Sequence, residues 1–399
     1  MILAVALSVV LLLIAWLWLR FAKREVSQAI WSTLEIPELA EDESPLVSII
    51  VCACNQPQDI TRCIPSLLRQ DYACFEVIVV DSHLSDGACQ SLSEMEAAAD
   101  GRLRLLEADV PPPGWSRRPA ALQQGMEKAR GDWLLFTTAE SYHAPALLSR
   151  AMAYIRLQGL GMLSLAPRQE CRTFWEHVCH PVAWQYLSFL MPMERVGETN
   201  ARGVWASEEF LLVSRVAYTL AGGHAAAASA LHEGSSLMQR VKALGYHVEF
   251  VKAMDLLHAR SYRTWHQLWE GWGRSFSSLL GPHPLRVALH VLGLFAWTVL
   301  PFAALLPAFS FGFWGLDVIH GWWDVVLAAC AILAGVTILQ AASVVRRVHR
   351  QSHFYTVTLP LGGICVAAAG LNGLIRTRLR KGGGRESRCF ANTVQSDNC

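Results

Sequence analysis

The sequence predicts an α/β protein with a doubly wound sheet in the middle of the chain and membrane-spanning helices on either side of it. Strand patterns alternate with helical patterns from about residue 44 to residue 284, and long apolar runs occupy both ends. Of the 399 residues, 53% are hydrophobic and 17% are charged, which is more apolar than an ordinary soluble enzyme. We therefore divide the chain into an anchor (1–22), an α/β domain (44–284), two or three membrane segments (285–376) and a disordered tail (381–399).

The charge balance and the cysteines exclude three classes of protein. The 34 Lys and Arg against 33 Asp and Glu give a formal net charge of +1. The long-range field that holds a polyanion is therefore missing, and we expect no nucleic-acid partner. The 11 cysteines include no paired C-x-x-C spacing, so the sequence predicts neither a zinc framework nor a disulfide framework.

The first apolar run, Ile2–Leu19, is long enough at 1.5 Å per residue to cross a hydrocarbon core of about 30 Å. Arg20, Lys23 and Arg24 follow it directly. A signal peptide carries its positive charges before the apolar region, so this run predicts a retained anchor. Because basic residues favour the cytoplasmic side, we expect a multi-pass protein of the inner cell membrane with its α/β domain in the cytoplasm.

Three more apolar stretches follow the α/β domain, at 285–309, 323–345 and 354–375. The basic cluster at 346–350 falls inside on this topology, as the positive-inside rule requires. The basic residues at 376–381 fall outside, which conflicts with the rule. Since Pro360, Gly362 and Gly363 interrupt the last stretch, we expect a re-entrant or interfacial segment there.

The α/β domain begins with four predicted buried strands, each a run of β-branched or other apolar residues. The strands are Val47–Ala53, Glu76–Val80, Leu103–Glu107 and Trp133–Thr137. Helical spacing predicts helices over Asp59–Gln70 and Pro119–Ala129. The succession builds βαβ units and an open parallel sheet, which binds ligands beyond the carboxyl ends of its strands. Those ends are residues 55–56, 81–86, 109–115 and 138–141.

Several stretches at these strand ends carry a family resemblance. PLVSIIVCACNQ, RCIPSLLRQDY and FEVIVVDSHLSDG resemble, in order and spacing, the nucleotide-binding half of the family 2 glycosyltransferases, which have the GT-A fold of nucleotide-diphospho-sugar transferases. PPPGWSRRPAALQQGMEKARGDWLLFTTAES and AYTLAGGHAAAASALHEGSSLMQRVKALGYHVEF are similar to a membrane-anchored branch that glycosylates hopanoid, carotenoid or ceramide-type lipids. The resemblance implies inverting transfer of one sugar from a nucleotide-sugar donor, expected to be a UDP-sugar, to a lipid acceptor.

The resemblance also assigns donor-binding positions. Asn55 stands in the place of the first residue of an Asn-Glu pair, and Asp81 and Asp86 stand at or near a pair of aspartates that bind the donor nucleoside. The metal-binding Asp-x-Asp reads Thr138-Ala139-Glu140, which leaves Glu140 as the one carboxylate for Mg²⁺ or Mn²⁺. We therefore expect weak metal binding.

Arg117 and Arg118 fall where the family carries a basic residue near the nucleotide. A guanidinium matches phosphate geometry with two donors, so these side chains are candidates to take over part of the task of the metal ion. The alternative is a pair of arginines in contact with solvent or lipid headgroups.

The general base is the position that departs most from the family. The aspartate that takes the acceptor proton follows a glutamate, and the chain reads His232-Glu233-Gly234 there. Glu233 is the candidate base, and His232 is a weaker candidate. The alternative is an acidic loop that caps a helix and has no chemistry.

On the acceptor side, Gly222 and Gly223 precede His224 as in the lipid-glycosylating branch, and two consecutive glycines predict positive φ angles in a turn. His224 is either an acceptor-site residue or a hydrogen-bonded structural histidine. Trp175 and Trp184 lie in a stretch, 168–192, where aromatic and charged residues alternate. That composition predicts a segment at the membrane interface, with core packing as the alternative.

Two functions from different classes follow. The first is a membrane-bound hexosyltransferase that acts on a lipid. The Gln-x-x-Arg-Trp signature of processive synthases fails after Gln267, where Glu270 stands in place of arginine, so a single transfer is expected. The second is a catalytically silent homologue that serves as a scaffold or nucleotide-binding partner in a lipid pathway, which the altered motifs favour.

Overall fold

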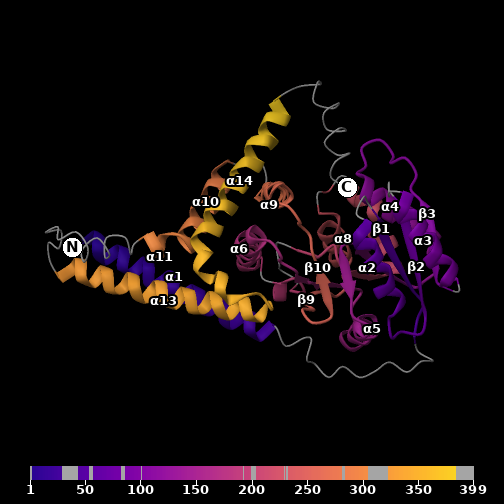
Figure 1. The fold of residues 1–399 in the computed structure, drawn as a ribbon, viewed down its shortest axis with the longest axis horizontal. Helices are drawn as coiled ribbons and strands as arrows, with labels where there is room; N and C mark the ends of the chain where they lie inside the picture. Colours follow the sequence, from indigo (N-terminus) through magenta and orange to yellow (C-terminus); the bar gives the residue numbers. More distant parts are fainter. Residues whose placement is uncertain are drawn as a thin grey trace. The chain divides into compact units, whose positions relative to one another are not determined.

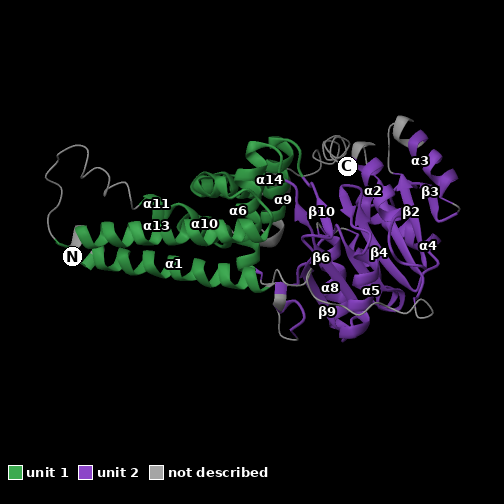
Figure 2. Cartoon of the chain, turned by 60° about the horizontal axis from the view of Figure 1, so that its bottom comes forward, with its two compact units in different colours: residues 1–29, 171–190, 262–396 green, residues 30–170, 191–261, 397–399 purple. Residues whose placement is uncertain are grey.

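The computed structural model describes residues 2–28, 44–53, 57–81, 86–99, 101–191, 193–198, 204–228, 230, 232–280, 284–303 and 322–382. The chain divides into two compact units, drawn in green and purple in Figure 2. Unit 1 holds residues 1–29, 171–190 and 262–396, and unit 2 holds residues 30–170, 191–261 and 397–399. Residues 171–190 and 262–280 thus group with the apolar helices, because aromatic residues in both stretches pack against each other, as Trp175 does on Trp265.

Unit 2 is built on a seven-stranded sheet of order β3-β2-β1-β4-β8-β6-β9. Figure 1 labels its strands β1, β2, β3 and β9. Its strands are β1 Val47–Ala53, β2 Phe75–Asp81, β3 Leu103–Glu107, β4 Trp133–Thr138, β6 Met162–Ala166, β8 Leu211–Ser214 and β9 Val248–Lys252. A second, three-stranded sheet joins β5 Ser141–His143, β10 Leu257–Ala259 and β7 Arg168–Gln169. The predicted strands are confirmed to within one residue at each end. The sheet is mixed, because β8 runs antiparallel to both β4 and β6.

Helices cover both faces of the large sheet. The helices of unit 2 are α2 Pro57–Leu68, α3 Asp86–Ala98, α4 Arg117–Lys128, α5 Leu147–Gln158, α7 Arg215–Leu220 and α8 Glu233–Ala243, with 3₁₀ turns η3 Met193–Arg195 and η4 His224–Ala227. On one face Ile49 packs with Ile64 of α2 and Leu148 of α5. On the other, a Cβ added to Gly125 of α4 would lie 2.6 Å from Ile50 Cγ2, so only glycine lets α4 approach this closely. The sheet is therefore doubly wound, as predicted.

Unit 1 consists of helices. They are α1 Ile2–Gln28, α6 Phe174–Leu190, α9 Trp265–Leu280, α10 Pro284–Thr298, α11 Leu300–Ala303, α13 Trp322–Val348 and α14 Leu359–Gly382, with the 3₁₀ turn η5 His353–Thr358. Within the described ranges, three stretches are long and apolar enough to cross a membrane: Ala4–Ser27, Val325–Val348 and His353–Arg376. The predicted stretch 285–309 contains the shorter α10, and residues 304–309 lie outside the described residues, as do residues 383–399 of the predicted tail.

Helices α1 and α13 lie side by side (Figures 1 and 2). His349 Nε2 lies 2.7 Å from Glu25 Oε2, and Trp18 donates its indole N–H to the Trp297 carbonyl oxygen at 3.0 Å. The contact between His349 and Glu25 brings the basic clusters at 20–24 and 346–350 to the same end of the helix pair.

Helix α14 packs along α9 through glycines. A Cβ on Gly373 would lie 2.1 Å from the Gly273 carbonyl oxygen, so the two backbones are in direct contact. Arg376, at the basic end of α14, forms an ion pair with Glu270 of α9. The basic end of α14 therefore lies beside the helix that leads into α10.

Candidate active site

The carboxyl edge of the large sheet gathers four chain segments. β1 runs parallel to β2 and β4, with Cys52 opposite both Val80 and Thr138 in register, so these strands end together. β8 runs the other way and pairs Leu211 with Phe136. The residues just before β8 therefore arrive at the edge where β4 ends, and Thr137 Oγ1 donates a hydrogen bond to the Glu209 carbonyl oxygen at 2.6 Å.

Three charged side chains meet at this edge. Arg118 comes from the first turn of α4, Glu208 from the segment before β8, and Glu233 is the first residue of α8. Arg118 Nη1 donates to Glu233 Oε1 at 2.6 Å and also to Glu208 Oε2, while Nη2 donates to the Glu208 backbone carbonyl at 3.2 Å. We call these residues, with His232, the edge cluster.

The pKa values of the two carboxyl groups of the edge cluster are shifted in opposite directions. Burial raises the pKa of Glu233 to about 7, because its side chain is only 7% exposed and Arg118 offsets that cost only in part. Burial also opposes ionisation of Glu208, but Arg118 and His232 outweigh it and lower its pKa to about 2. Glu208 is therefore the permanent anion. Glu233 exchanges its proton near neutral pH, which is the property expected of a general base.

Arg118 remains a cation throughout. Burial disfavours its charge, but Glu233 and Glu208 outweigh that effect and raise its pKa. One guanidinium thus faces two carboxylates, of which only Glu208 is ionised at every pH near neutrality.

One histidine, His232, belongs to the edge cluster, and a second, His224, lies near it. His232 Nδ1 lies 3.8 Å from Glu208 Oε1, beyond hydrogen-bond distance, and its ring packs on Trp205 with centroids 5.0 Å apart. His224 is buried in η4, and its Nδ1 lies 2.8 Å from the Tyr218 hydroxyl. Burial, reinforced by Arg118, lowers the pKa of His224 to about 3, so this ring is neutral. The preceding Gly222 and Gly223 have φ angles of 83° and 58°, as the sequence predicted.

Among the part of the chain that the structure describes, no partner is found for the Nε2 atoms of His232 and His224 or for Glu208 Oε1, and all three atoms are buried. Buried polar atoms are nearly always hydrogen-bonded in folded proteins. The edge cluster therefore carries hydrogen-bonding capacity that its own described side chains leave unused.

Of the other predicted donor residues, Asp81 and Arg117 are placed along the same edge. Asp81 ends β2, opposite Ala53 of β1 and Glu107 of β3, and Arg117 begins α4 next to Arg118. Asn55 lies outside the described residues, and Asp86 is described only as the first residue of α3. Of the predicted site residues, the ones that the structure brings together around Glu208 are Arg118, Glu233 and His232.

The triplet Thr138-Ala139-Glu140 follows β4. The Thr138 hydroxyl lies 2.8 Å from Ser141 Oγ, and the Glu140 backbone carbonyl accepts from Arg260 N at 3.4 Å. Within the described ranges, no three His, Cys, Asp or Glu side chains are grouped to hold a metal. One carboxylate at this position fits a divalent cation only if donor phosphates supply most of its other ligands.

The remaining acceptor candidates belong to unit 1. The Trp175 ring lies 4.6 Å from Trp265 and 5.1 Å from Phe174, and it is 36% exposed. Trp184 is half-buried in the middle of α6. Trp175 thus belongs to an aromatic group on α6 and α9, and the role of both tryptophans in acceptor binding stays a prediction.

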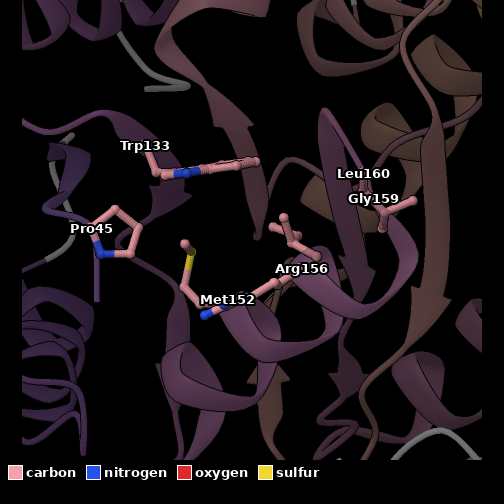
Figure 3. A pocket seen from close by; sticks show the side chains of 7 residues that line it. Pro45, Trp133, Met152, Arg156, Gly159 and Leu160 are labelled. Atoms are coloured by element: carbon pink, nitrogen blue, oxygen red, sulfur yellow. The ribbon is translucent and has the colours of Figure 1, made fainter. Parts of the chain in front are cut away.

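A cavity of about 460 Å³ opens at the opposite, amino edge of the sheet (Figure 3). Its lining comes from the residues before β1 and at the start of β4 and from the end of α5: Pro45, Trp133, Met152, Ile155, Arg156, Gly159 and Leu160. The lining is mostly apolar with a single charge. It lacks the convergent polar groups of the edge cluster, so the carboxyl edge is the candidate active site.

Glu208 and Glu209 are not among the site residues that the sequence predicts. Glu209 is held by Ser207 Oγ and, at 3.4 Å, by Ser261 Oγ. Two adjacent glutamates immediately before the apolar run Phe210–Val213 were the available signal. The antiparallel strand that carries them to the edge could not be recognised, because four residues are too few for a periodic pattern.

Part of the chain is similar to known glycosyltransferases. Residues 48–194 match the model of Glycosyl transferase family 2. The "Uncharacterized glycosyltransferase EpsJ" of Bacillus subtilis is 34% identical over 106 residues, and the "Succinoglycan biosynthesis protein ExoO" of Rhizobium meliloti is 31% identical over 137 residues. The matches cover 27% and 32% of this chain and span only 29% and 37% of those two proteins.

A solved structure shares the fold over nearly the whole chain. The mannosyltransferase PcManGT from Pyrobaculum calidifontis, in complex with GDP-Man and Mn²⁺, covers 93% of this chain and 97% of its own, with a TM-score of 0.52 at 17% identity. The predicted GT-A fold with apolar helices at both ends is therefore confirmed. Together with the family match, the similarities support a glycosyltransferase.

Proposed function

We propose that the protein is a membrane-bound glycosyltransferase that moves one sugar from a nucleotide-sugar donor to a lipid hydroxyl at the cytoplasmic membrane face. The observation that carries the proposal is the edge cluster: a buried glutamate that titrates near pH 7 lies beside an arginine, at the sheet edge where GT-A-type sheets bind ligands. The family match and the apolar helices supply the reaction class and the membrane.

Glu233 is the proposed general base of an inverting transfer. Its carboxylate takes the proton of the acceptor hydroxyl while the hydroxyl oxygen forms a bond to the anomeric carbon of the sugar. The bond from that carbon to the diphosphate oxygen breaks, and its electron pair leaves with the nucleoside diphosphate. Attack from the face opposite the leaving group inverts the anomeric centre, and no covalent sugar–protein intermediate is needed.

Arg118 and Arg117 are the proposed ligands of the diphosphate, with Asp81, Asp86 and Asn55 on the nucleoside side. Arg118 is 24% exposed, and it lies in the first turn of α4, where the helix dipole favours an anion. Glu140 and the donor phosphates would hold a divalent cation, which supplies charge neutralisation for the diphosphate when bound. A UDP-sugar and a GDP-sugar are both candidate donors, since the neighbour PcManGT was solved with GDP-Man.

The membrane placement rests on unit 1. The basic clusters at 20–24 and 346–350 lie at one end of the α1–α13 pair, which supports a shared cytoplasmic end. Because Arg376 pairs with Glu270 of α9, we propose that the basic end of α14 also stays on the cytoplasmic side and that α14 is interfacial or re-entrant. Reporter fusions after Pro284 and after residue 382 should both behave as cytoplasmic. A lumenal or periplasmic signal at Pro284 would overturn the placement of the catalytic half.

The transfer itself is tested with the full chain in detergent or native membranes. Radiolabelled UDP- and GDP-sugars are offered with extracted membrane lipids, and the products are separated by solvent extraction. Label in a lipid of increased polarity, absent with Glu233→Gln, is the expected result. Label in an oligosaccharide chain instead would favour a saccharide acceptor, as the similarity to a succinoglycan biosynthesis protein suggests, and would overturn the lipid assignment. No transfer with any donor would favour the silent homologue.

A further inference from the structure

The bonds that Arg118 makes to the two carboxylates of the edge cluster are unequal. Glu208 receives hydrogen bonds from both Nη1 and Nη2, through its side chain and its backbone carbonyl. Glu233 receives one bond, from the same Nη1 that Glu208 already shares. The contact with Glu233 is therefore the one that Arg118 can give up while it stays anchored to Glu208.

A diphosphate is a natural replacement for Glu233 as the partner of Arg118. Arg118 lies at the amino end of the 12-residue helix α4, beside Arg117, and about a quarter of its side chain is exposed. A guanidinium binds phosphate oxygens in a two-pronged geometry, and the helix terminus adds a favourable field. Glu233, only 7% exposed, is reached less easily from solvent than Arg118 is.

We propose that Glu208 and Arg118 are positioning residues that couple the general base to the donor. Without donor, Glu208 holds Arg118 against Glu233. When donor binds, its diphosphate takes the place of Glu233 on Arg118, and the base is released to face the acceptor hydroxyl. The inference rests on the proposed function, because it assigns the base and donor roles to those same residues.

The coupling changes the number of protons bound to the protein when the donor binds, and this number can be measured. Glu233 is faced by Arg118 from α4 and by Glu208 from the segment before β8. His232 lies near Glu208, Glu209 acts on Arg118, and Arg118 in turn acts on the neutral His224. Arg118 lowers the pKa of Glu233, and Glu208 raises it. Withdrawing Arg118 toward phosphate therefore raises the pKa of Glu233, so near pH 7 part of the Glu233 population takes up a proton as the diphosphate binds, and the fraction that stays ionised acts as the base.

The experiment measures proton uptake when UDP, and separately GDP, binds to the full chain in detergent. Calorimetry near pH 7 in two buffers of different ionisation enthalpy gives the number of protons exchanged per nucleotide bound. The expected result is an uptake, a fraction of one proton, that is present in the wild type and absent in Glu233→Gln. The variant subtracts the protons exchanged by the nucleotide itself.

A second pair of variants distinguishes positioning from a structural role. Glu208→Gln removes one negative charge from beside the diphosphate site, while its amide oxygen still accepts from Arg118, so UDP should bind several-fold more tightly. If Glu208 only supports the fold, the same variant weakens binding. Arg118→Gln should weaken UDP binding about 10- to 100-fold, as expected for a charged hydrogen bond. Arg104→Gln, which breaks an arginine–glutamate pair at the amino edge of the same sheet, is the matched control and should change neither affinity nor proton exchange.

The outcomes separate the coupling from the proposed function. Equal proton exchange in wild type and Glu233→Gln, with nucleotide bound and sugar transferred, overturns the coupling alone. Failure of both nucleotides to bind overturns the coupling and the donor site together. Should Arg118→Gln fail to fold because it leaves two buried carboxylates without their cation, the comparison of wild type with Glu233→Gln still decides.

Discussion

At both edges of the unit 2 sheet an arginine pairs with a glutamate, but at the amino edge each oxygen of the glutamate carboxylate already has a hydrogen-bond partner. There Glu76 accepts hydrogen bonds from the Ser48 hydroxyl at 2.6 Å, from the Arg130 backbone N–H at 2.7 Å and from Arg104 Nη2 at 2.7 Å. Both carboxylate oxygens are used, by donors that come from strands β1 and β3 and from the loop after α4. These hydrogen bonds hold the strands together at the amino edge, and neither oxygen of Glu76 is left to bind a ligand.

At the carboxyl edge the same chemistry is left incomplete. Two carboxylates share one nitrogen of Arg118, and one oxygen of Glu208 and a nitrogen on each of two histidines have no hydrogen-bond partner among the described residues. The difference teaches that an ion pair alone does not mark a site. A site is marked by a cation that two carboxylates share unequally and by buried polar atoms without partners, because a ligand can form hydrogen bonds with these groups.

The largest effect should come from the base. Glu233→Gln keeps the shape of the side chain and removes its proton affinity, so the transfer rate should fall about 10²- to 10⁴-fold while UDP affinity is retained. Glu76→Gln is the control from the amino edge and should leave the rate per folded molecule unchanged. Steady-state transfer with both variants checks this. An active Glu233→Gln protein would move the search for the base to His232, Glu208 and Glu209.

The second prediction concerns pH. The reaction requires ionised Glu233, whose pKa burial raises to about 7, so kcat/KM for the donor should rise about tenfold per pH unit below pH 7 and level off above it. An ordinary exposed glutamate would already be ionised at pH 5.5. Initial rates from pH 5.5 to 8.5 check this. A rate that stays constant down to pH 5.5 would show that Glu233 is not the titrating base.

The third prediction concerns stability, for which a substitution at the amino edge should have a larger effect than one at the carboxyl edge. Glu76→Gln should lower the free energy of unfolding by about 1–3 kcal/mol, because its amide cannot accept from all three donors and leaves buried groups without partners. Glu233→Gln should cost less, since a buried carboxyl that is already half protonated at pH 7 resembles an amide. Thermal unfolding of both variants at pH 7 gives the ranking. The opposite order would mean that the edge cluster is mainly a structural ion network.

The contrast between the edges also shows how far sequence reasoning reaches. The strands of the nucleotide-binding half were predictable because continuous runs such as Val47–Ala53 are typical of strands buried on both faces. The position of Glu233 was predictable from the family resemblance. Its partners were not, because Glu208 lies in the segment before the short antiparallel strand β8 and Arg118 is 115 residues away in the chain. Spacing along a sequence carries no information on such pairings.

The division of the chain into two units, each built from separate stretches of sequence, could not be predicted either. Residues 168–192 are predicted to be a segment at the membrane interface, or core packing, inside the α/β domain. In the structure Trp175 packs on Trp265 of α9, and the Tyr186 hydroxyl donates to the His290 carbonyl oxygen of α10. These contacts connect stretches about 90 to 105 residues apart, which no local pattern reveals. The predicted domain boundary at residue 284 followed hydropathy alone.

The smallest effect should come from the metal. Since Glu140 is the one carboxylate of the triplet and Arg117 and Arg118 lie at the same edge, chelation with EDTA should weaken UDP binding by less than about tenfold. Glu140→Gln should then bind UDP in EDTA as the wild type does, whereas Arg118→Gln should bind it less well with or without Mg²⁺ or Mn²⁺. UDP titrations in EDTA and in each metal give the comparison. A loss of several orders of magnitude on chelation would mean that a complete metal site forms with the donor and that the arginines of the carboxyl edge do not replace it.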